Sequence, residues 1–307
     1  MTDAGHRTTC WSAVALVVAA LCLLTACSGS SGGSRGGPGG ASPATSFPSS
    51  GSTGSSGVAS GPTWLVTRSA LAELVADPSV RQRLASAQVY EILQPGQQLL
   101  AGVTARAVVT FSSAATLMET VRSGQVPAGA YGVLYDPEHW SFTPMAEQQD
   151  PVAAASQAAQ AAHARGLKLL VAPAMNLTTV LGSGSSGGGA RWQQFLDLRL
   201  IAHLAQVADV VELQAQSLER NTATYTSFVR QAAAQARAAR AGVTVLAGLS
   251  SNPSGPPVTS GQLTDVIRST RSLVDGYWLN IPGPGARCPS CSAPAPGVAQ
   301  QALQAAI

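Results

Sequence analysis

The sequence contains few charged residues and a single lysine. Charged residues make up 11% of the 307 positions, the formal net charge is +3, and Lys168 is the one lysine. The arginines occur in small scattered groups, such as Arg81 with Arg83, and no basic stripe with interleaved aromatic residues is present. A protein that binds nucleic acid usually carries such a stripe. We therefore expect no nucleic-acid partner and place the arginines on solvated helix faces.

Motifs of several common enzyme classes are missing as well. Trp64 begins the first predicted strand and is followed by Leu-Val-Thr-Arg-Ser, without the glycine-rich turn that binds dinucleotides. The loop Gly182–Gly189 consists of Gly and Ser but lacks the Lys-Ser/Thr ending of a phosphate-binding loop. No Gly-x-Ser-x-Gly elbow follows a predicted strand, which disfavours Ser-His-Asp catalysis. These absences predict a chain without a cofactor, and we interpret Gly182–Gly189 as an insertion or a lid.

Residues 1–27 predict an export signal. His6 and Arg7 give a positively charged start, and Trp11–Leu24 is an apolar run of 14 residues. A membrane-spanning helix takes about 20 residues, so this run suits a signal peptide instead. It ends in Leu-Thr-Ala-Cys27, which resembles the lipobox of bacterial lipoproteins, where small residues precede a cysteine that is diacylated before cleavage.

The lipobox resemblance implies a protein cut before Cys27, anchored by palmitate-type acyl chains on that cysteine, and held on the extracytoplasmic face of the cell membrane. Two acyl chains give a stable anchor where one does not. An ordinary secretory cleavage site with a chance cysteine is the alternative.

The segment 28–62 consists almost wholly of Ser, Gly, Pro, Ala and Thr. Such a segment buries too little apolar surface to offset the entropy of ordering it. We predict a disordered tether that spans roughly 30–35 Å on average as a flexible coil. Residues 63–307 then form one domain.

Cys288 and Cys291 form a close pair, Cys-Pro-Ser-Cys, in a late proline-rich loop. Outside the cytoplasm such a pair is expected to be a disulfide. A redox-active pair is the alternative, although a reactive thiolate is favoured at a helix start. A zinc site would require a second pair of ligands, which is missing, so we expect no metal. The remaining cysteines, Cys10 and Cys22, fall in the export signal.

From Thr63 onward, short apolar runs alternate with longer alanine-rich helical runs. The predicted strands are Trp64–Thr67, Val89–Leu93, Ala107–Phe111, Tyr131–Tyr135, Lys168–Ala172, Asp209–Leu213, Val243–Leu249 and Gly276–Ile281. The predicted helices are Ser69–Ala87, Ala114–Arg122, Pro151–Arg165, Arg191–Val207, Leu218–Arg240, Gln262–Leu273 and Val298–Ala306. Alternating strands and helices form parallel sheets.

Eight repeats in about 245 residues match the size of a closed (β/α)8 TIM-like barrel, and this α/β fold is our prediction. Residues 95–106 show little helical pattern, so the second connection is expected to be irregular. An open doubly wound sheet is the alternative, which the missing glycine-rich turn disfavours.

The end of the fourth predicted strand carries the densest group of reactive and aromatic residues: Tyr135, Asp136, Glu138, His139 and Trp140. In a (β/α)8 barrel, active sites lie where the strands end. Asp136 and Glu138 are two positions apart, so on extended backbone their side chains point to the same side. Paired carboxylates serve glycoside hydrolysis, because one donates a proton while the other stabilises positive charge or attacks. Trp140 is a candidate platform for a sugar ring. The alternative for the whole segment is an ordinary capped loop, because Asp-Pro often starts a turn.

Three further segments supply candidate ligand contacts, namely Glu212, Gln214 and Gln216 on strand six, Trp278 and Asn280 on strand eight, and Asn176 after strand five. Polar residues at every second position give strand six a polar face, whereas parallel barrel strands are normally apolar. The alternatives are a buried hydrogen-bond network for strand six, core packing for Trp278 and a loop turn for Asn176.

The fourth strand resembles that of the family 18 chitinase-type glycosidases. Those enzymes are (β/α)8 barrels whose fourth strand ends in D-x-x-D-x-D-x-E, with the final Glu as the acid, and a tryptophan from strand eight lies under the sugar. Asp136-Pro-Glu138 matches the last D-x-E, and Trp278 matches the tryptophan by strand position. Tyr131 and Leu134 stand where the family has its two earlier aspartates.

The resemblance implies a role for each matching residue. Glu138 would be the acid and Asp136 would orient an N-acetyl group of the substrate. Gln214 or Gln216, where the family has a Tyr-Asp pair, would hold the oxygen of that group.

The sequence leaves three functions open. The first is a membrane-anchored glycoside hydrolase that acts on a polysaccharide with Glu138 as its acid. The second is a barrel without catalysis that binds a glycan or another wall component through Trp140 and Trp278. The third is a structural lipoprotein with no small ligand.

Overall fold

The computed structural model describes residues 61–182, 190–285, 288 and 291–306. The predicted export signal with Cys10, Cys22 and Cys27, the tether, and all but the first residue of Gly182–Gly189 lie outside the described residues. Within the described ranges, none of the helices combines the length and the apolar character that crossing a membrane requires.

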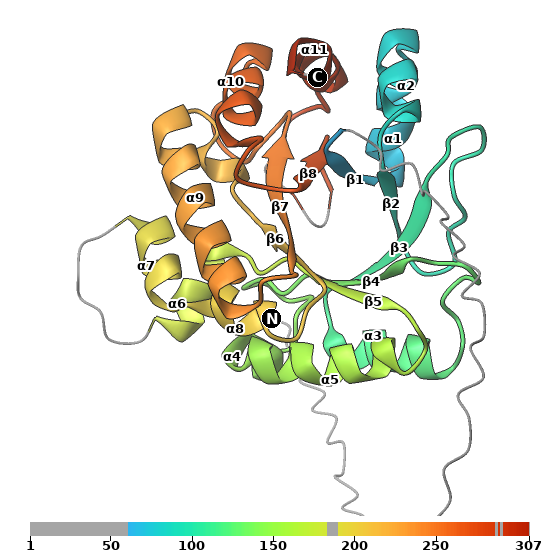
Figure 1. Ribbon diagram of the computed structural model, residues 1–307, viewed down its shortest axis with the longest axis vertical. Helices are drawn as coiled ribbons and strands as arrows, with labels where there is room; N and C mark the ends of the chain where they lie inside the picture. The colour runs from blue at the N-terminus through green and yellow to red at the C-terminus, as the bar shows by residue number, and fades with distance from the viewer. Residues whose placement is uncertain (1–60, 183–189, 286–287, 289–290, 307) are drawn as a thin grey trace, which may run out of the picture. The chain divides into compact units, whose positions relative to one another are not determined.

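The described residues form a closed barrel of eight parallel strands, β1 to β8, in which each strand pairs with the next and β8 pairs with β1 (Figure 1). The strands are β1 Thr63–Thr67, β2 Val89–Leu93, β3 Arg106–Phe111, β4 Gly132–Tyr135, β5 Lys168–Val171, β6 Val210–Leu213, β7 Thr244–Ser250 and β8 Gly276–Asn280. The predicted (β/α)8 barrel is thereby confirmed, with strand ends within two residues of the predicted positions.

Side chains along each strand alternate between two apolar layers. The inner layer fills the barrel and consists of Leu65, Tyr90, Ile92, Val108, Leu134, Leu170, Ala172, Val210, Leu246 and Trp278. The outer layer lies between the barrel and the helices. On β4, for example, Leu134 belongs to the inner layer, whereas Val133 and Tyr135 belong to the outer one. Residues that continue the inner parity past a strand end therefore face the mouth of the barrel.

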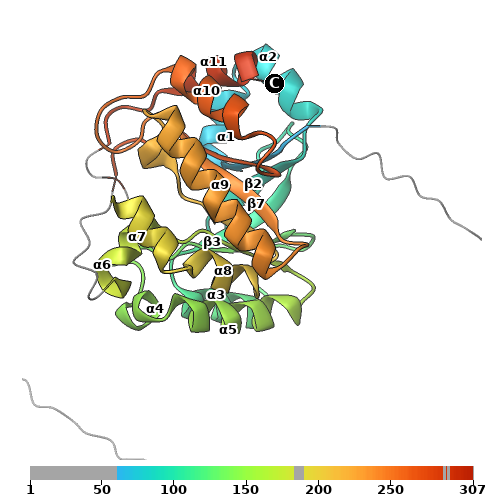
Figure 2. The same cartoon turned by 60° about the vertical axis from the view of Figure 1, so that its left-hand side comes forward.

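The helices surround the strands. They are α1 Arg68–Leu74, α2 Pro78–Ala85, α3 Ala114–Arg122, α4 Met145–Gln149, α5 Pro151–His163, α6 Thr178–Leu181, α7 Arg191–Asp197, α8 Leu200–Ala205, α9 Thr222–Ala239, α10 Ser260–Thr270 and α11 Pro296–Ala306. Two 3-10 turns, η1 Met175–Leu177 and η2 Gln216–Leu218, follow β5 and β6. Figure 2 shows α4, α6 and α7 gathered together, and contacts join α4 to α6 and α6 to α7.

Two helices that the sequence predicts as continuous are broken. Ser69–Ala87 is interrupted between α1 and α2, because Pro78 restricts Asp77 to an extended conformation with φ −83° and ψ 120°. The Asp77 carboxylate then accepts hydrogen bonds from Ser79 N and Val80 N and starts α2. Arg191–Val207 is interrupted at Arg199, whose φ of 52° is left-handed and cannot continue a right-handed helix.

The connection between β2 and β3 has no helix, as expected, and runs along the outside of the barrel as an irregular loop (Figure 1). A buried carboxylate replaces the missing helix as an anchor. Both oxygens of Glu91 on β2 accept a hydrogen bond from Leu100 N, at 3.0 and 2.9 Å, and one oxygen pairs with Arg68 at 3.2 Å. A side chain of strand β2 thus supplies the hydrogen-bond acceptor that a backbone N–H of the loop requires.

Candidate functional site

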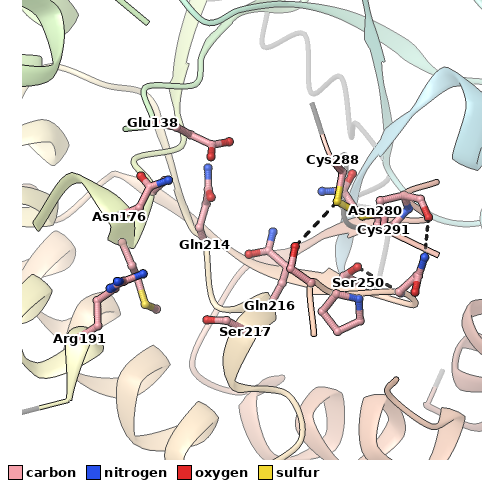
Figure 3. Close-up of a pocket in the computed structure, with 16 residues that line it drawn as sticks. Glu138, Asn176, Arg191, Gln214, Gln216, Ser217, Ser250, Asn280, Cys288 and Cys291 are labelled. Carbon is pink, nitrogen blue, oxygen red and sulfur yellow. Dashed lines mark hydrogen bonds between the residues drawn. A yellow bond between two sulfur atoms is a disulfide. The ribbon is translucent and has the colours of Figure 1, made fainter. Parts of the chain in front are cut away.

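A cavity of about 370 Å³ opens at the carboxyl end of the barrel strands, where active sites of this fold lie. Its polar wall includes Glu138, Asn176, Arg191, Gln214, Gln216 and Asn280. In the view of Figure 3, Arg191 and Asn176 stand on one side, Gln216, Ser250 and Asn280 on the other, and Glu138 and Gln214 lie between them with their side chains pointing toward one another. Five predicted site residues from the ends of β4, β5, β6 and β8 therefore line one cavity, namely Glu138, Asn176, Gln214, Gln216 and Asn280.

Asp136 continues the inner parity of β4 and is buried below Glu138, with 6% of its surface exposed. Its Oδ1 accepts a hydrogen bond from Gln214 Nε2 at 2.8 Å. The second N–H of the same amide donates to the Ala172 carbonyl at 2.9 Å. Both Gln214 donors are thus used within the protein, so this side chain fixes Asp136 and leaves the donation of hydrogen bonds to a ligand to other residues.

Glu212 lies inside the barrel on β6, and 1% of its surface is exposed. Within the described residues neither of its side-chain oxygens has a hydrogen-bond partner. Burial raises the pKa of Glu212 well above its ordinary value of 4.5, and the nearby negative charges of Asp136 and Glu138 raise it further. Burial and the two neighbouring acidic groups therefore both favour the protonated, neutral form of Glu212.

Gly248 on β7 provides the space for this buried acid. A Cβ atom at position 248 would lie 2.5 Å from Glu212 Oε1 and 2.5 Å from Gln216 Nε2, closer than Cβ contacts in real proteins. The neighbouring Ala172 is also small and belongs to the inner layer. Small residues on both sides of β6 thus allow the long polar side chains of Glu212 and Gln216 to lie within the barrel mouth.

The loop after β4 is fixed by a compact hydrogen-bond network. The Glu138 backbone N–H donates to Thr143 Oγ1 at 3.2 Å, and His139 N donates to Asn176 Oδ1 at 2.8 Å. The buried Gln148 side chain donates to the carbonyls of Trp140 and Thr143 at 2.8 and 2.7 Å. Its oxygen lies 2.7 Å from His139 Nδ1. The backbone that carries Glu138 is therefore held by Thr143 from its own loop, Gln148 from α4 and Asn176 from η1.

Glu147 on α4 ties this loop to the neighbouring repeat. Its carboxylate accepts hydrogen bonds from Ala114 N at 2.7 Å and Ala115 N at 3.1 Å, which are unpaired donors in the first turn of α3. The same group accepts hydrogen bonds from the hydroxyls of Ser113 and Tyr135. Because a helix N-terminus favours negative charge, Glu147 both caps α3 and anchors the chain that follows Glu138.

The opposite wall of the cavity is built from the β7 end and the predicted disulfide. Cys288 and Cys291 are joined, with their Cα atoms 5.3 Å apart, and both line the cavity. Asn252 holds this loop in place, because its Nδ2 donates to the Pro282 carbonyl at 3.0 Å and to the Ser292 carbonyl at 3.1 Å. The expected disulfide is confirmed, and its position makes it part of the wall.

Other polar side chains on the wall are available for a ligand. Within the described part of the chain, Gln216 and Asn280 make no side-chain hydrogen bond, and the Nδ2 group of Asn176 donates to nothing. Carboxamides carry both donors and acceptors. The cavity thus presents neutral amide groups on two sides of Glu138, which suits a ligand rich in hydroxyl and amide oxygens.

Six of the predicted site residues do not line the cavity. Asp136 and Glu212 are buried, and the other four are Tyr135, His139, Trp140 and Trp278. Tyr135 is in the outer layer and bonds Glu147, and Trp278 packs in the inner layer below Asn280. His139 is exposed and uses its ring for the bond to Gln148, while Trp140 donates to Thr143 Oγ1 at 2.9 Å and packs edge-on against Phe142. Because side chains alternate along β4, Tyr135 faces the helices while Asp136 faces the inside of the barrel.

Sequence reasoning missed Arg191, Gly248 and Asn252. Arg191 follows a glycine-serine run and carried no motif, and Asn252 acts through a loop distant in sequence. Gly248 offered one signal, a glycine at an inner position of an otherwise apolar strand, which marks close approach of another group. In the described residues no group of three or more His, Cys, Asp or Glu side chains is arranged to hold a metal ion.

No protein-family model matches the sequence, and neither does any curated protein. Solved structures with a similar fold include chitinases, other glycoside hydrolases and a putative deoxyribose-phosphate aldolase. A chitinase from Chromobacterium violaceum is 12% identical and has a TM-score of 0.44, over 80% of this chain and 98% of that one. A spore cortex-lytic enzyme from Bacillus megaterium is 11% identical with a TM-score of 0.42, over 71% of this chain and 70% of that one.

A thermostable mutant of a xylanase from Cellvibrio japonicus is similar to the same degree, with 10% identity and a TM-score of 0.44 over 80% of this chain and 98% of that chain. Likenesses at this level carry no information on substrate or activity. The closed strand order shows the fold, and the residues of the cavity have to account for the chemistry.

Proposed function

We propose that this chain is a glycoside hydrolase that cleaves a polysaccharide with Glu138 as the general acid. The observation that carries the proposal is the approach of three carboxyl groups at the barrel mouth. Asp136 and Glu138 come from the end of β4, and both raise the pKa of Glu212 on β6. Glycosidases need one carboxyl group that gives up a proton and one that stays ionised.

Glu138 has the position that an acid requires. It is half-buried and lines the cavity, so that a bound glycosidic oxygen can reach it. In the proposed reaction, Glu138 donates its proton to the leaving oxygen as the bond from the sugar C1 to that oxygen breaks. Water then adds to C1, and its second proton returns to Glu138.

Asp136 is proposed to orient the group that stabilises the positive charge at C1, an N-acetyl group in the resemblance drawn from the sequence. The Gln214 bond holds the Asp136 carboxylate in one direction. Since both Gln214 donors are occupied, Gln216, which begins the turn η2 after β6, is the amide that remains to hold the N-acetyl oxygen. The raised pKa of Glu212 favours its neutral form, which limits the negative charge that accumulates around Asp136.

The site of action is part of the proposal. The lipobox at Cys27 and the tether would place the barrel outside the cytoplasmic membrane, within reach of wall polysaccharide. Globomycin, which blocks processing of lipoprotein signals, is expected to leave the precursor uncut, and a Cys27→Ser variant is expected to lose labelling by a palmitate analogue. Unchanged processing and labelling in both cases would remove the anchor from the proposal.

The test of the reaction compares the wild type with Glu138→Gln on a panel of glycans, with reducing ends measured as product. Loss of a general acid is expected to lower kcat by about 10²–10⁴-fold. Glu73→Gln is the matched control, because Glu73 is exposed on α1, away from the cavity. Equal rates for wild type and Glu138→Gln would refute the role of Glu138, and binding without any hydrolysis would favour the non-catalytic alternative.

A further inference from the structure

Arg191 is the positively charged residue of the cavity wall. It begins α7, is exposed, and stands with Asn176 on one side of the cavity (Figure 3). Among the described lining residues, Glu138 and Arg191 are the two that ionise, since the cysteines are joined as a disulfide. The two side chains form no ion pair with each other. The wall thus carries one acid and one separate cation, with neutral amides between them.

The guanidinium of Arg191 has no acceptor in the described part of the chain. Several other arginines of the domain do have an acceptor within the protein. Arg220 donates to the Pro256 carbonyl at 2.8 Å, Arg237 forms an ion pair with Asp275 at 3.1 Å, and Arg240 forms one with Asp209 at 3.7 Å. Arg191 keeps its five donors and its full charge directed at the cavity side of the molecule.

The chemistry of a guanidinium indicates what would occupy this position. Its planar donors match the two oxygens of a carboxylate or phosphate, and such charge-assisted pairs are stronger than bonds between neutral groups. Hydroxyl and amide oxygens of a neutral sugar are already served by Asn176, Gln216 and Asn280. A permanent charge adds binding energy chiefly when the ligand carries the opposite charge.

We propose that Arg191 binds an anionic substituent, a carboxylate or a phosphate, on the glycan whose glycosidic bond faces Glu138. The inference rests on the proposed function for the identity of the ligand as a glycan. It narrows the substrate class to acidic polysaccharides, such as chains with uronic acids, lactyl ethers or sugar phosphates. A cavity of about 370 Å³ is at the lower end of the roughly 300–1,000 Å³ that small-ligand sites occupy, which suits a substituted sugar ring.

Binding is measured in the Glu138→Gln background, so that hydrolysis neither consumes the ligand nor enters the readout. The probes share a β-1,4-linked N-acetylglucosamine backbone. They are chitin oligosaccharides, which are neutral, peptide-free peptidoglycan strands, in which alternate sugars carry a lactyl carboxylate, and chitin oligosaccharides phosphorylated at O6. We expect at least one anionic probe to bind about 10-fold or more tightly than the neutral one, with a preference that weakens as salt is raised.

The matched variants are Arg191→Gln and Arg230→Gln, each combined with Glu138→Gln. Arg230 is exposed on α9 and does not line the cavity. Arg191→Gln is expected to remove the preference, because it weakens binding of the anionic probe far more than binding of neutral chitin oligosaccharide, whereas Arg230→Gln keeps the preference. Dependence on Arg191 for the carboxylated or for the phosphorylated probe supports the inference and identifies the anion.

Equal affinity for all three probes, or a preference that survives Arg191→Gln, would overturn the inference. The two proposals fail separately. Hydrolysis of neutral chitin oligosaccharides without any preference in binding would support the proposed glycosidase activity and refute the anion site. Arg191-dependent binding of an acidic glycan without cleavage by the wild type would support the anion site and refute the glycosidase activity.

Discussion

Gln214 and Asp136 are joined by a 2.8 Å hydrogen bond that links the carboxyl ends of β6 and β4. The residues are distant in the sequence, and β5 lies between their strands. The bond passes over Ala172, whose small side chain leaves the space open and whose carbonyl accepts the second Gln214 donor. One amide therefore connects three strands and fixes the direction of the carboxylate next to Glu138.

Replacing Gln214 by methionine is expected to lower kcat more than it changes KM. The change removes the donor to Asp136 while keeping the length of the side chain. A hydrogen bond to a charged group contributes about 1.5–3 kcal/mol, which corresponds to roughly a 10- to 100-fold loss. Gln216→Met is the comparison, because Gln216 has a free amide and is expected to raise KM. Steady-state kinetics on both variants check the contrast, and identical effects would contradict the division of roles.

Gly248→Ala is expected to destabilise the domain by about 1–3 kcal/mol, as overpacking of a filled interior does. The new methyl group would displace Glu212 and Gln216, each 2.5 Å from its position, and catalysis is expected to fall with stability. Urea denaturation gives the free energy of unfolding. Gly242→Ala is the control, since nothing lies within 4 Å of a Cβ there. A fully stable and active Gly248→Ala protein would show that the barrel mouth is loosely packed.

Glu212→Gln is expected to stabilise the protein increasingly as pH rises. In the folded state the pKa of Glu212 is raised above 4.5, so the folded protein holds this proton more tightly than the unfolded chain. The wild type therefore loses stability above pH 4.5, by up to about 1.4 kcal/mol per pH unit, until Glu212 ionises in the folded state. The variant lacks this loss.

Thermal unfolding of both proteins from pH 4.5 to 8 measures the difference. The buried Glu219 has a raised pKa too, but it is present in both proteins and cancels. Glu73→Gln is again the control, because an exposed glutamate has no burial to relieve. A difference between wild type and Glu212→Gln that stays constant with pH would show that Glu212 is not held neutral in the folded state.

Much of the fold was predictable from hydrophobic periodicity. Each barrel strand is a short apolar run, and the helix Ala114–Arg122 was predicted with the bounds that α3 has. The break before Pro78 was also accessible in principle, since Asp-Pro is a common way to start a helix. The break at Arg199 was not, because a left-handed arginine follows from packing of the whole chain and leaves no local pattern.

The cavity was predictable in part, because parity and the rule that strand ends carry the site bring Glu138, Gln214, Gln216 and Asn280 together. The alternation of side chains along β8 also points Trp278 into the barrel. How deep it lies depends on the register between strands, which cannot be predicted from the sequence pattern. Whether a polar residue faces ligand or protein was equally hidden. His139 and Trp140 use their polar atoms within the loop, and this depends on contacts with Gln148 and Thr143 across the turn.

The carboxylate of Glu147 has a consequence for how the protein responds to heat. It closes the first turn of α3 from α4, so the segment that bears Glu138 cannot loosen unless a neighbouring helix frays as well. Inactivation on warming should then coincide with cooperative loss of the entire barrel, without an earlier phase in which a folded protein has already lost its acid.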